Sequence, residues 1–530
     1  MGRLDISGSP TVELEIPAFG GLNTAKTFSE IEMSESPRML NNLPGKIGGL
    51  AKRAGSVPLT TTAIGSIPTL ANLRKAGNNT ILAGSGNTLY KYNAGAWTAQ
   101  TMTAALNSAA FDWAQFRDAT AQEVLMIADG TALKYYNGTE VKNVTPAPDD
   151  TTPTDAPANV LAARNPIGVL VHNNRLVIWE ANSDTLFNSK VGFFDYFRQT
   201  DFQRFVRQND YIQTCVTYAG ALLVFMRYNI GVRFGDGYSA TPTADDWSQD
   251  FVDTSDGCVN PRSVQLVVYP DGREEVFYQS DKGVHAVYTI DTLSLDTSAR
   301  YSTRSVTKNQ IDFKALGLTK AEWHAASSYF YDQRYWLIYK KAGVYHGLVF
   351  DANTSQWYPV DNIKAQAFLN DEDYLYFAAE DGHLKIFDDE LTDDWNDAAK
   401  TSGTPINWYW HSKLMTPKLT GFDHFWDILL IEARQLYGTS TIDVEVNTYR
   451  SRYQVTGAIK TEIMIVGVSR IGEAQIANQN LTDFVNNAKR LRTCDNGLRG
   501  QYAQIKLSNP RSEKVEIYNI KYEVRMMTKY

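Results

Sequence analysis

The sequence predicts an all-β protein that combines a β-propeller, an additional β-sandwich-like domain and an extended N-terminal arm. Three observations carry this prediction. The chain has 29 Tyr, 23 Phe and 11 Trp, and aromatic rings favour half-buried pleated surfaces. Its 36 Gly are what many short strands joined by turns would require. Similar pairs of strand-like segments also recur along much of the chain.

The length of 530 residues exceeds what one hydrophobic core supports, so we divide the chain into residues 1–60, 61–395 and 396–530. Residues 1–60 are crowded with Gly, Pro, Asn and Ser and have few clustered apolar residues. Such a segment cannot form a core of its own. We expect an extended arm that is ordered only against its own fold or a neighbouring chain.

Residues 61–390 contain a recurring β-hairpin. Each copy is a strand, a Gly turn and a second strand with an aromatic residue near its end. Two hairpins make a four-stranded blade of about 40–50 residues, which predicts roughly six to eight blades. Ring closure would protect the strand edges, whereas a pair of β-sandwiches, the alternative, would show similar strand spacing. The four clearest copies begin at Asn79, Glu123, Glu275 and Tyr374.

Two segments interrupt the hairpins. Residues 147–166 are rich in Pro, Ala, Asp and Thr and predict a long exposed loop. Residues 291–319 carry little periodicity, and 319–323 have the pattern of a short helix start. We expect helix to be confined to short pieces such as this one near Trp323.

After Asp394 the pattern predicts longer strands and a second domain, a sandwich with one solvated face. Its clearest alternation is in residues 515–524. The apolar positions there are odd-numbered up to Ile517 and even-numbered from Tyr518, which predicts a β-bulge at that step.

The charge balance argues against a protein that grips nucleic acid. The chain has 51 basic and 59 acidic residues, a net charge of −8, whereas tight phosphate binding needs an excess of positive charge. A surface past which DNA slides without adhering remains compatible with this charge.

Cysteine content and terminal composition favour a soluble protein made in a reducing cytoplasm. Cys215, Cys258 and Cys494 are an odd number without short spacing, so neither a disulfide framework nor a zinc knuckle fits. Residues 1–10 lack the apolar run of a signal peptide. No stretch approaches the ~20 apolar residues of a membrane span, so we expect no membrane insertion by this chain.

We find no motif for catalysis, cofactor binding or metal binding, and we nominate no residue for these roles. Gly84-Ser85-Gly86 resembles a phosphate loop but lacks the helix that should follow it. No Gly-x-Ser-x-Gly elbow occurs. The histidines lack metal-ligand spacing, and we interpret them as structural; they are His172, His285, His324, His346, His383, His411 and His424.

Clustered charges are interpreted as solvated turns and rims. A glycosidase needs two carboxyls facing one sugar, whereas neighbouring residues on a strand point to opposite faces. Calcium loops would need a twelve-residue pattern that is missing here. The acidic pairs are Asp149-Asp150, Asp245-Asp246, Asp388-Asp389 and Asp393-Asp394; the basic cluster, expected on a loop, is Lys489-Arg490 with Arg492 and Arg499.

Several short segments follow one another in a distinctive order along the chain. They begin with Phe19-Gly20-Gly21-Leu22-Asn23, Asn41-Asn42 and Lys52-Arg53-Ala54-Gly55. They continue with Asn174-Arg175, Asn188-Ser189, Gly257-Cys258-Val259-Asn260 and Gln356-Trp357. This order resembles the tail hub and nozzle proteins of short-tailed bacteriophages. In that family a Gly-Gly-Leu-Asn opening is followed by an Asn-rich turn and a basic stop before the first blade, and similar blade motifs follow. The resemblance covers most of residues 15–390, and nothing in residues 396–530 matches.

This resemblance implies a virion protein that forms a ring, generally a hexamer, below the portal and its adaptor. Such a ring is the tail tube or nozzle through which the genome leaves, and it helps to retain packaged DNA. Partners would be other copies of the chain and the portal and adaptor proteins, with tail fibres or spikes as further candidates. We expect an acidic lumen that DNA passes without tight binding.

Two other functions stay open. The first is a propeller-based carbohydrate-binding adhesin or polysaccharide-degrading tail protein, because Tyr and Trp at strand ends can also bind sugars. The second is a regulatory scaffold of the cell, which would be expected to work as a monomer.

Overall fold

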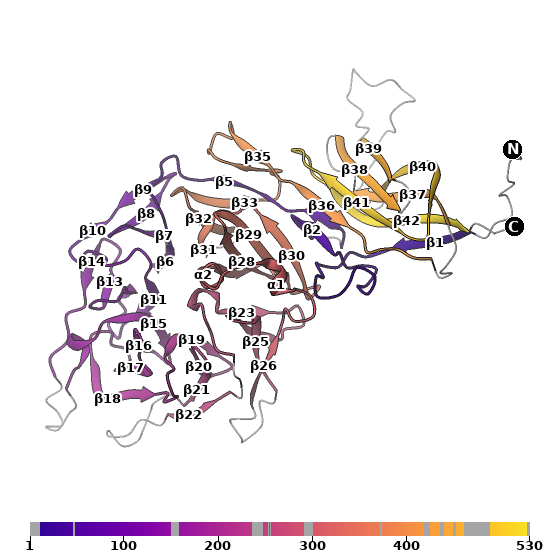
Figure 1. The fold of residues 1–530 in the computed structure, drawn as a ribbon. Helices are drawn as coiled ribbons and strands as arrows, with labels where there is room; N and C mark the ends of the chain where they lie inside the picture. Colours follow the sequence, from indigo (N-terminus) through magenta and orange to yellow (C-terminus); the bar gives the residue numbers. More distant parts are fainter. Residues whose placement is uncertain are drawn as a thin grey trace, which may run out of the picture.

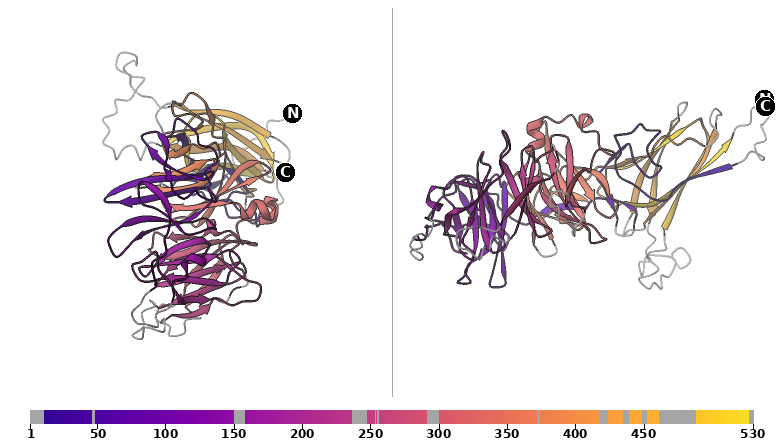
Figure 2. Two further views of the ribbon diagram at one scale, coloured as in Figure 1. Left: turned by 90° about the vertical axis from the view of Figure 1, so that its left-hand side faces the viewer. Right: turned by 90° about the horizontal axis from the view of Figure 1, so that it is seen from below.

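The computed structural model describes residues 11–45, 48–149, 158–235, 247–252, 254, 256–290, 300–371, 374–417, 424–434, 439–448, 452–460 and 488–526. Its architecture is two β bodies side by side along one long axis, a propeller and a sandwich (Figures 1 and 2). Within the described part, helix is limited to two short α-helices and two 3-10 turns. None of its helices has the length and apolar character to cross a bilayer.

Seven sheets of the described residues follow one another round a ring, and the first three use consecutive strands (Figure 1). The first sheet holds β6 (Thr69–Lys75), β7 (Asn78–Ser85), β8 (Thr88–Asn93) and β9 (Ala96–Ala99). The second holds β10 (Thr101–Met102), β11 (Asp112–Arg117), β12 (Glu123–Ala128), β13 (Lys134–Tyr136) and β14 (Glu140–Asn143). The third holds β15 (Pro166–His172), β16 (Arg175–Glu180), β17 (Thr185–Ser189) and β18 (Phe197–Arg204).

The next three sheets are four-stranded antiparallel blades of the same design. The fourth holds β19 (Ile212–Tyr218), β20 (Ala221–Met226), β21 (Ile230–Phe234) and β22 (Ser248–Phe251). The fifth holds β23 (Gln265–Val268), β24 (Glu274–Ser280), β25 (Gly283–Thr289) and β26 (Tyr301–Ser305). The sixth holds β27 (Ser327–Tyr331), β28 (Arg334–Lys341), β29 (Val344–Asp351) and β30 (Gln356–Asp361).

The seventh blade closes the ring with a strand from the N-terminal segment. Its order is β31 (Ala365–Asp371), β32 (Tyr374–Ala379), β33 (Leu384–Asp388), β5 (Gly55–Pro58), β34 (Asp393–Trp395) and β35 (Gly403–Pro405). Its residues Leu369, Ala378 and Leu384 pack against Leu70 and Ile81 of the first blade in one buried cluster. The propeller prediction is therefore confirmed, and the alternative of two sandwiches over this region is wrong.

Each predicted hairpin is the central strand pair of its own blade: β7 with β8, β12 with β13, β24 with β25, and β32 with β33. The predicted four-stranded blade is present in five of the seven sheets, but the recurring motif supplies only the second and third of the four antiparallel strands. The outer strands are less alike because they face neighbours and solvent unequally. β26 in particular was missed, since it lies in the 291–319 segment that we interpreted as an insertion.

The predicted helix near Trp323 is α2 (Lys320–His324). Thr319 and Glu322 form a capping box at its start, and Trp323 is buried against Phe313 of α1 (Phe313–Leu316). Reciprocal capping satisfies orphan N–H groups, which lets so short a helix persist.

The C-terminal body is a sandwich of two sheets. One contains β3 (Asn42–Pro44), β4 (Leu50–Lys52), β42 (Glu516–Met526), β37 (His424–Arg434) and β40 (Ala488–Gly500), with β1 (Thr11–Ile16) also on β42. The other contains β2 (Arg38–Leu40), β36 (Trp408–His411), β41 (Ala503–Asn509), β38 (Thr439–Thr448) and β39 (Arg452–Lys460). Both sheets contribute to one buried core, which holds Trp410, Trp426, Ile505 and Ile520.

The bulge predicted in the last strand is present. β37 pairs Glu432 with Asn519 and Ala433 with Ile517, so Tyr518 is the extra residue of β42. Ile517 and Ile520 are both buried, because the bulge restores the inward face after the change of parity.

Within the 1–60 segment, the described residues 11–45 and 48–60 lie along their own fold and contribute strands to both bodies. β1 to β4 join the sandwich and β5 joins the propeller. The last propeller sheet also continues past residue 395, to Pro405. The 61–395 and 396–530 segments are thus fastened to each other by the N-terminal segment.

Candidate functional site

The junction of the two bodies is built around the side chain of Arg53. Its guanidinium donates to both oxygens of Asp394, at 3.1 and 2.6 Å, to Asn41 Oδ1 at 2.9 Å and to the Asp361 carbonyl at 2.9 Å. The Arg53 and Asp394 side chains are 1% and 8% exposed. A bidentate, fully hydrogen-bonded pair is the arrangement in which burial of two charges is tolerated.

Asn41 continues this network with a left-handed backbone conformation, φ +57°. Its amide donates to Asp361 Oδ1 and to the Asn407 carbonyl, both at 2.7 Å. Its Oδ1 also accepts from the Asp361 N–H at 3.0 Å. Asn adopts this backbone region more readily than other non-Gly residues, so one residue turns the arm and ties it to blade six.

The arm then packs closely on β30. Leu22 N–H donates to the Trp357 carbonyl at 2.7 Å, and a Cβ at Gly21 would lie 2.5 Å from the same oxygen. Phe19 meets Trp410 of the sandwich edge-on, with ring centroids 5.3 Å apart. Gly21 is therefore required because the Trp357 carbonyl lies too close for a Cβ atom, and not because of its backbone angles.

A cleft of about 970 Å³ lies at this junction. Lys52 and Lys514 line it from the sandwich side, and Arg334, Tyr374 and Asp388 line it from blades six and seven. Lys52 Nζ donates to the Arg511 carbonyl at 2.5 Å, and burial lowers the pKa of Lys52 to about 8. Arg334 donates to the Pro44 carbonyl at 2.8 Å. The Arg334 bond joins the two walls of the cleft, whereas the Lys52 bond lies within the sandwich wall.

Of the acidic pairs, Asp393-Asp394 corrects our expectation. We interpreted it as a solvated turn, but both residues lie on β34 and are buried at 7% and 6% exposure. Asp394 binds Arg53, and Asp393 accepts from the Ser512 hydroxyl at 2.8 Å. Asp388 ends β33, Asp149 accepts from the Asn159 N–H, and Asp150 and Asp245-Asp246 lie outside the described residues.

The basic cluster also corrects our expectation, because Lys489, Arg490, Arg492 and Arg499 lie on strand β40 rather than on a loop. We expected a loop because no apolar alternation marks this strand in the sequence.

The histidines are spread over separate parts of the fold, and three of them have the following side-chain partners. His172 Nδ1 is 3.0 Å from Thr217 Oγ1, and burial lowers its pKa to about 4. His383 Nδ1 is 3.1 Å from Thr60 Oγ1, and His324 pairs with Asp281 at 3.0 Å. His285 lies on β25 and is buried. Among the described residues, no three His, Cys, Asp or Glu side chains are close enough to hold a metal ion.

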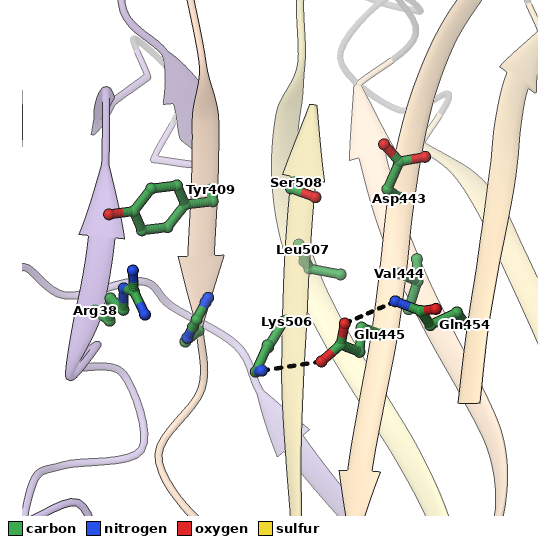
Figure 3. Close-up of a pocket in the computed structure, with 10 residues that line it drawn as sticks. Arg38, Tyr409, Asp443, Val444, Glu445, Gln454, Lys506, Leu507 and Ser508 are labelled. Carbon is green, nitrogen blue, oxygen red and sulfur yellow. Dashed lines mark hydrogen bonds and ion pairs between the residues drawn. The ribbon is translucent and has the colours of Figure 1, made fainter. Parts of the chain in front are cut away.

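A second hollow, of about 610 Å³, lies on the exposed face of the β2–β36–β41–β38–β39 sheet (Figure 3). Arg38, Tyr409, Lys506 and Glu445 line it from four different strands. We missed this site because its residues are spread from 38 to 508, and no local pattern reveals which strands become neighbours.

Comparison with known proteins yields no family. No family model matches the chain, and no curated protein matches it. Solved structures with partial similarity include BamB from Moraxella catarrhalis, at 11% identity and a TM-score of 0.32 over 64% of this chain and 97% of that one. The computationally designed Ika8 protein has 12% identity and a TM-score of 0.34 over 69% and 99%. The propeller assignment rests on the order and packing of the sheets themselves.

Proposed function

We propose that the chain is a structural virion protein, one subunit of the tail hub or nozzle ring that lies below the portal and adaptor. The ring serves as a conduit for genome ejection and helps to retain packaged DNA. It has no catalytic role. Its partners are other copies of the chain, six in all, and the adjoining head-to-tail connector proteins.

One observation carries this proposal: the segments that resemble the tail family are the joints of this fold. In the arm, Gly21 packs on Trp357, Asn41 binds Asp361, and Arg53 binds Asp394. These three contacts fasten the arm to the propeller, and the ring contact of Phe19 with Trp410 fastens it to the sandwich. In this chain, the residues that carry the resemblance thus make contacts that join the arm to the rest of the fold.

The propeller segments of the resemblance have the same character. Asn188 of blade three accepts from Arg233 of blade four at 2.6 Å. The amide of Asn260 donates to Gln279 Oε1 at 2.6 Å and to the Ala326 carbonyl, next to blade six, at 2.7 Å. Both Asn side chains are buried. Buried amides between blades fix their relative placement, because an unpaired amide there would be costly.

A fastened junction suits a mechanical component. The arm, the propeller and the sandwich share buried polar contacts, so force applied to one body is transmitted to the other without a flexible linker between them. The N-terminal strand β5 pairs with β33 inside blade seven. This pairing keeps the ring of blades from opening.

Mass photometry and electron microscopy of the pure protein, alone and mixed with portal and adaptor rings, test the proposal. We expect closed six-subunit rings that stack on the adaptor. A strictly monomeric species that never joins those rings would refute it and favour a cellular scaffold. Turnover of capsular polysaccharide by the pure protein would instead favour a polysaccharide-degrading tail protein.

A further inference from the structure

Five side chains form one continuous row across the outer face of the second sandwich sheet. The strand register places each residue directly opposite the next. Arg38, Lys506, Glu445 and Gln454 can be followed from left to right in Figure 3. In order across the five strands, the row is Arg38, His411, Lys506, Glu445 and Gln454.

The first three positions concentrate positive charge. Arg38 and Lys506 flank His411 in this row. A protonated His411 would therefore lie directly opposite two cations, and like charges in directly opposed positions destabilise a sheet. Burial lowers the pKa of His411 to about 4, and the charges of Lys506 and Arg38 act in the same direction. His411 is therefore neutral at pH 7, and the two flanking cations remain.

The carboxylates of this face are already engaged. Glu445 accepts from Lys506 at 2.9 Å and from Gln454 at 2.8 Å, and it also pairs with Arg452. Burial opposes ionisation of Glu445, but its hydrogen bonds outweigh burial and lower the pKa to about 2. Asp443 binds Arg511 at 3.0 Å.

The cation at the end of the row is not engaged in this way. Arg38 is exposed, and its guanidinium lies 5.6 Å from the centroid of the Tyr409 ring. It has no carboxylate partner within the part of the chain that the structure describes. The hollow thus offers N–H and O–H donors from Arg38, Lys506 and Tyr409 around a space of about 610 Å³, a volume within the usual range of ligand sites.

We propose that this hollow binds an acidic saccharide, a sugar bearing a carboxylate such as a uronic acid. The carboxylate pairs with Arg38, the cation of the row that has no carboxylate partner among the described residues, through charge-assisted hydrogen bonds. Lys506 already pairs with Glu445 and can offer one further N–H to the ligand. The sugar ring lies beside Tyr409, with the Ser508 hydroxyl in the next row available to its own hydroxyls. This inference does not rest on the proposed tail function.

A peptide fits this face less well than a sugar. β36, β41 and β38, the three central strands under the hollow, are each paired with neighbours on both sides, so a strand could be added only at the sheet ends, beside β2 or β39, and not within the hollow. Its apolar lining residues, Val444 and Leu507, are buried in the sandwich core. A groove for apolar peptide side chains is therefore missing from the described lining, whereas polar donors beside one aromatic ring suit a hydroxylated anion.

Isothermal titration calorimetry tests the proposal by measuring the affinity of the purified full-length protein for tetragalacturonic acid. Arg38→Gln should weaken binding by about ten- to a hundredfold, because it removes a hydrogen bond to a charged group. Tyr409→Ala should also weaken it. Arg74→Gln is the matched control, since it makes the same charge change at an exposed position on blade one and should leave affinity unchanged.

Three further ligands separate the alternatives. Maltotetraose, which is neutral, should not bind. Tetraglutamate binding as tightly as the sugar acid would identify a protein-docking face and overturn the proposal. Binding of inorganic phosphate with equal affinity would identify an unspecific anion site and overturn it too. So would an absence of binding to tetragalacturonic acid at millimolar concentration, or an affinity that Arg38→Gln does not change.

Discussion

Arg53 connects three parts of the chain, since its acceptors come from the N-terminal arm, blade six and blade seven. Arg53→Gln would leave Asp394 as a buried carboxylate without its bidentate partner. We expect it to lower the free energy of unfolding by about 3–5 kcal/mol, measured by denaturant titration.

Arg452→Gln serves as the control for this prediction. Arg452 also pairs with a carboxylate, Glu445, but its side chain is 60% exposed. Its removal should cost at most about 1 kcal/mol. Equal losses from the two substitutions would mean that the Arg53 network does not hold the junction together.

Asp112 begins the innermost strand of blade two and accepts from the Val169 N–H of blade three at 3.0 Å. Burial raises its pKa from 3.8 to about 6, against smaller lowering contributions from backbone N–H groups and Arg262. Because the folded protein disfavours the ionised form, the stability that Asp112 contributes is complete below pH 3.8 and is lost as pH rises through about 6.

Asp112→Asn removes this titration and keeps an acceptor oxygen for Val169. At pH 7 the variant should be more stable than the parent by on the order of 1–2 kcal/mol, allowing for partial solvent access, and at pH 4 the two should be alike. Unfolding midpoints at both pH values measure this. A stability difference that does not change with pH would contradict it.

At the residue scale, little of the candidate site was predictable from sequence. Arg53 and Asn41 stood out only as parts of a resemblance, because their partners are up to 341 residues away in the chain. Asp394 looked like a solvated residue because its neighbour is also acidic, and nothing local indicated that an arginine would cover it.

At the scale of elements, the arm depends on a glycine at close contact. Gly21→Ala places a Cβ 2.5 Å from the Trp357 carbonyl, so the arm must shift away from β30. We expect a loss of about 1–3 kcal/mol, the usual cost of overpacking. Gly20→Ala is a matched control, because its nearest atoms are 3.3 Å away, and it should be milder in the same thermal or denaturant unfolding assay.

The bulge at Tyr518 accounts for the change of parity in the last strand. Deletion of Tyr518 would remove the extra residue and leave Ile517 and Ile520 two positions apart, so both would still face inward. We expect this variant to retain the folded sandwich, seen as near-ultraviolet circular dichroism from its buried tryptophans. Deletion of Lys521, in the regular part of the strand, is the contrast: it would turn Tyr522 and Val524 toward the opposite face and should abolish that signal. Loss of the signal in the Tyr518 deletion as well would show that the bulge does not account for the parity change.

Elements with strong local patterns were predictable, and those completed by distant segments were not. The central hairpins, the capping box of α2 and the bulge at Tyr518 each leave a local signature in the sequence. β5 has only four residues, and its pairing with β33 joins positions more than 300 residues apart. That pairing depends on ring closure, which no local window contains.

At the scale of the whole molecule, the net charge predicts that assembled rings bind duplex DNA weakly. Six subunits of −8 each would give a ring of about −48, whose field acts over roughly the Debye length of about 10 Å. In the ring that we propose, a phosphate backbone would be repelled from the wall and the genome would move without a tight-binding step.

Duplex DNA should therefore bind assembled rings weakly, and its affinity should change little between 50 and 200 mM salt. Fluorescence anisotropy of a labelled duplex across that range measures both quantities. Unassembled subunits at the same chain concentration are the control, since they carry the same charge without a lumen. A steep fall of affinity with salt would report many phosphate contacts, and would mean that the channel grips the genome instead of letting it pass.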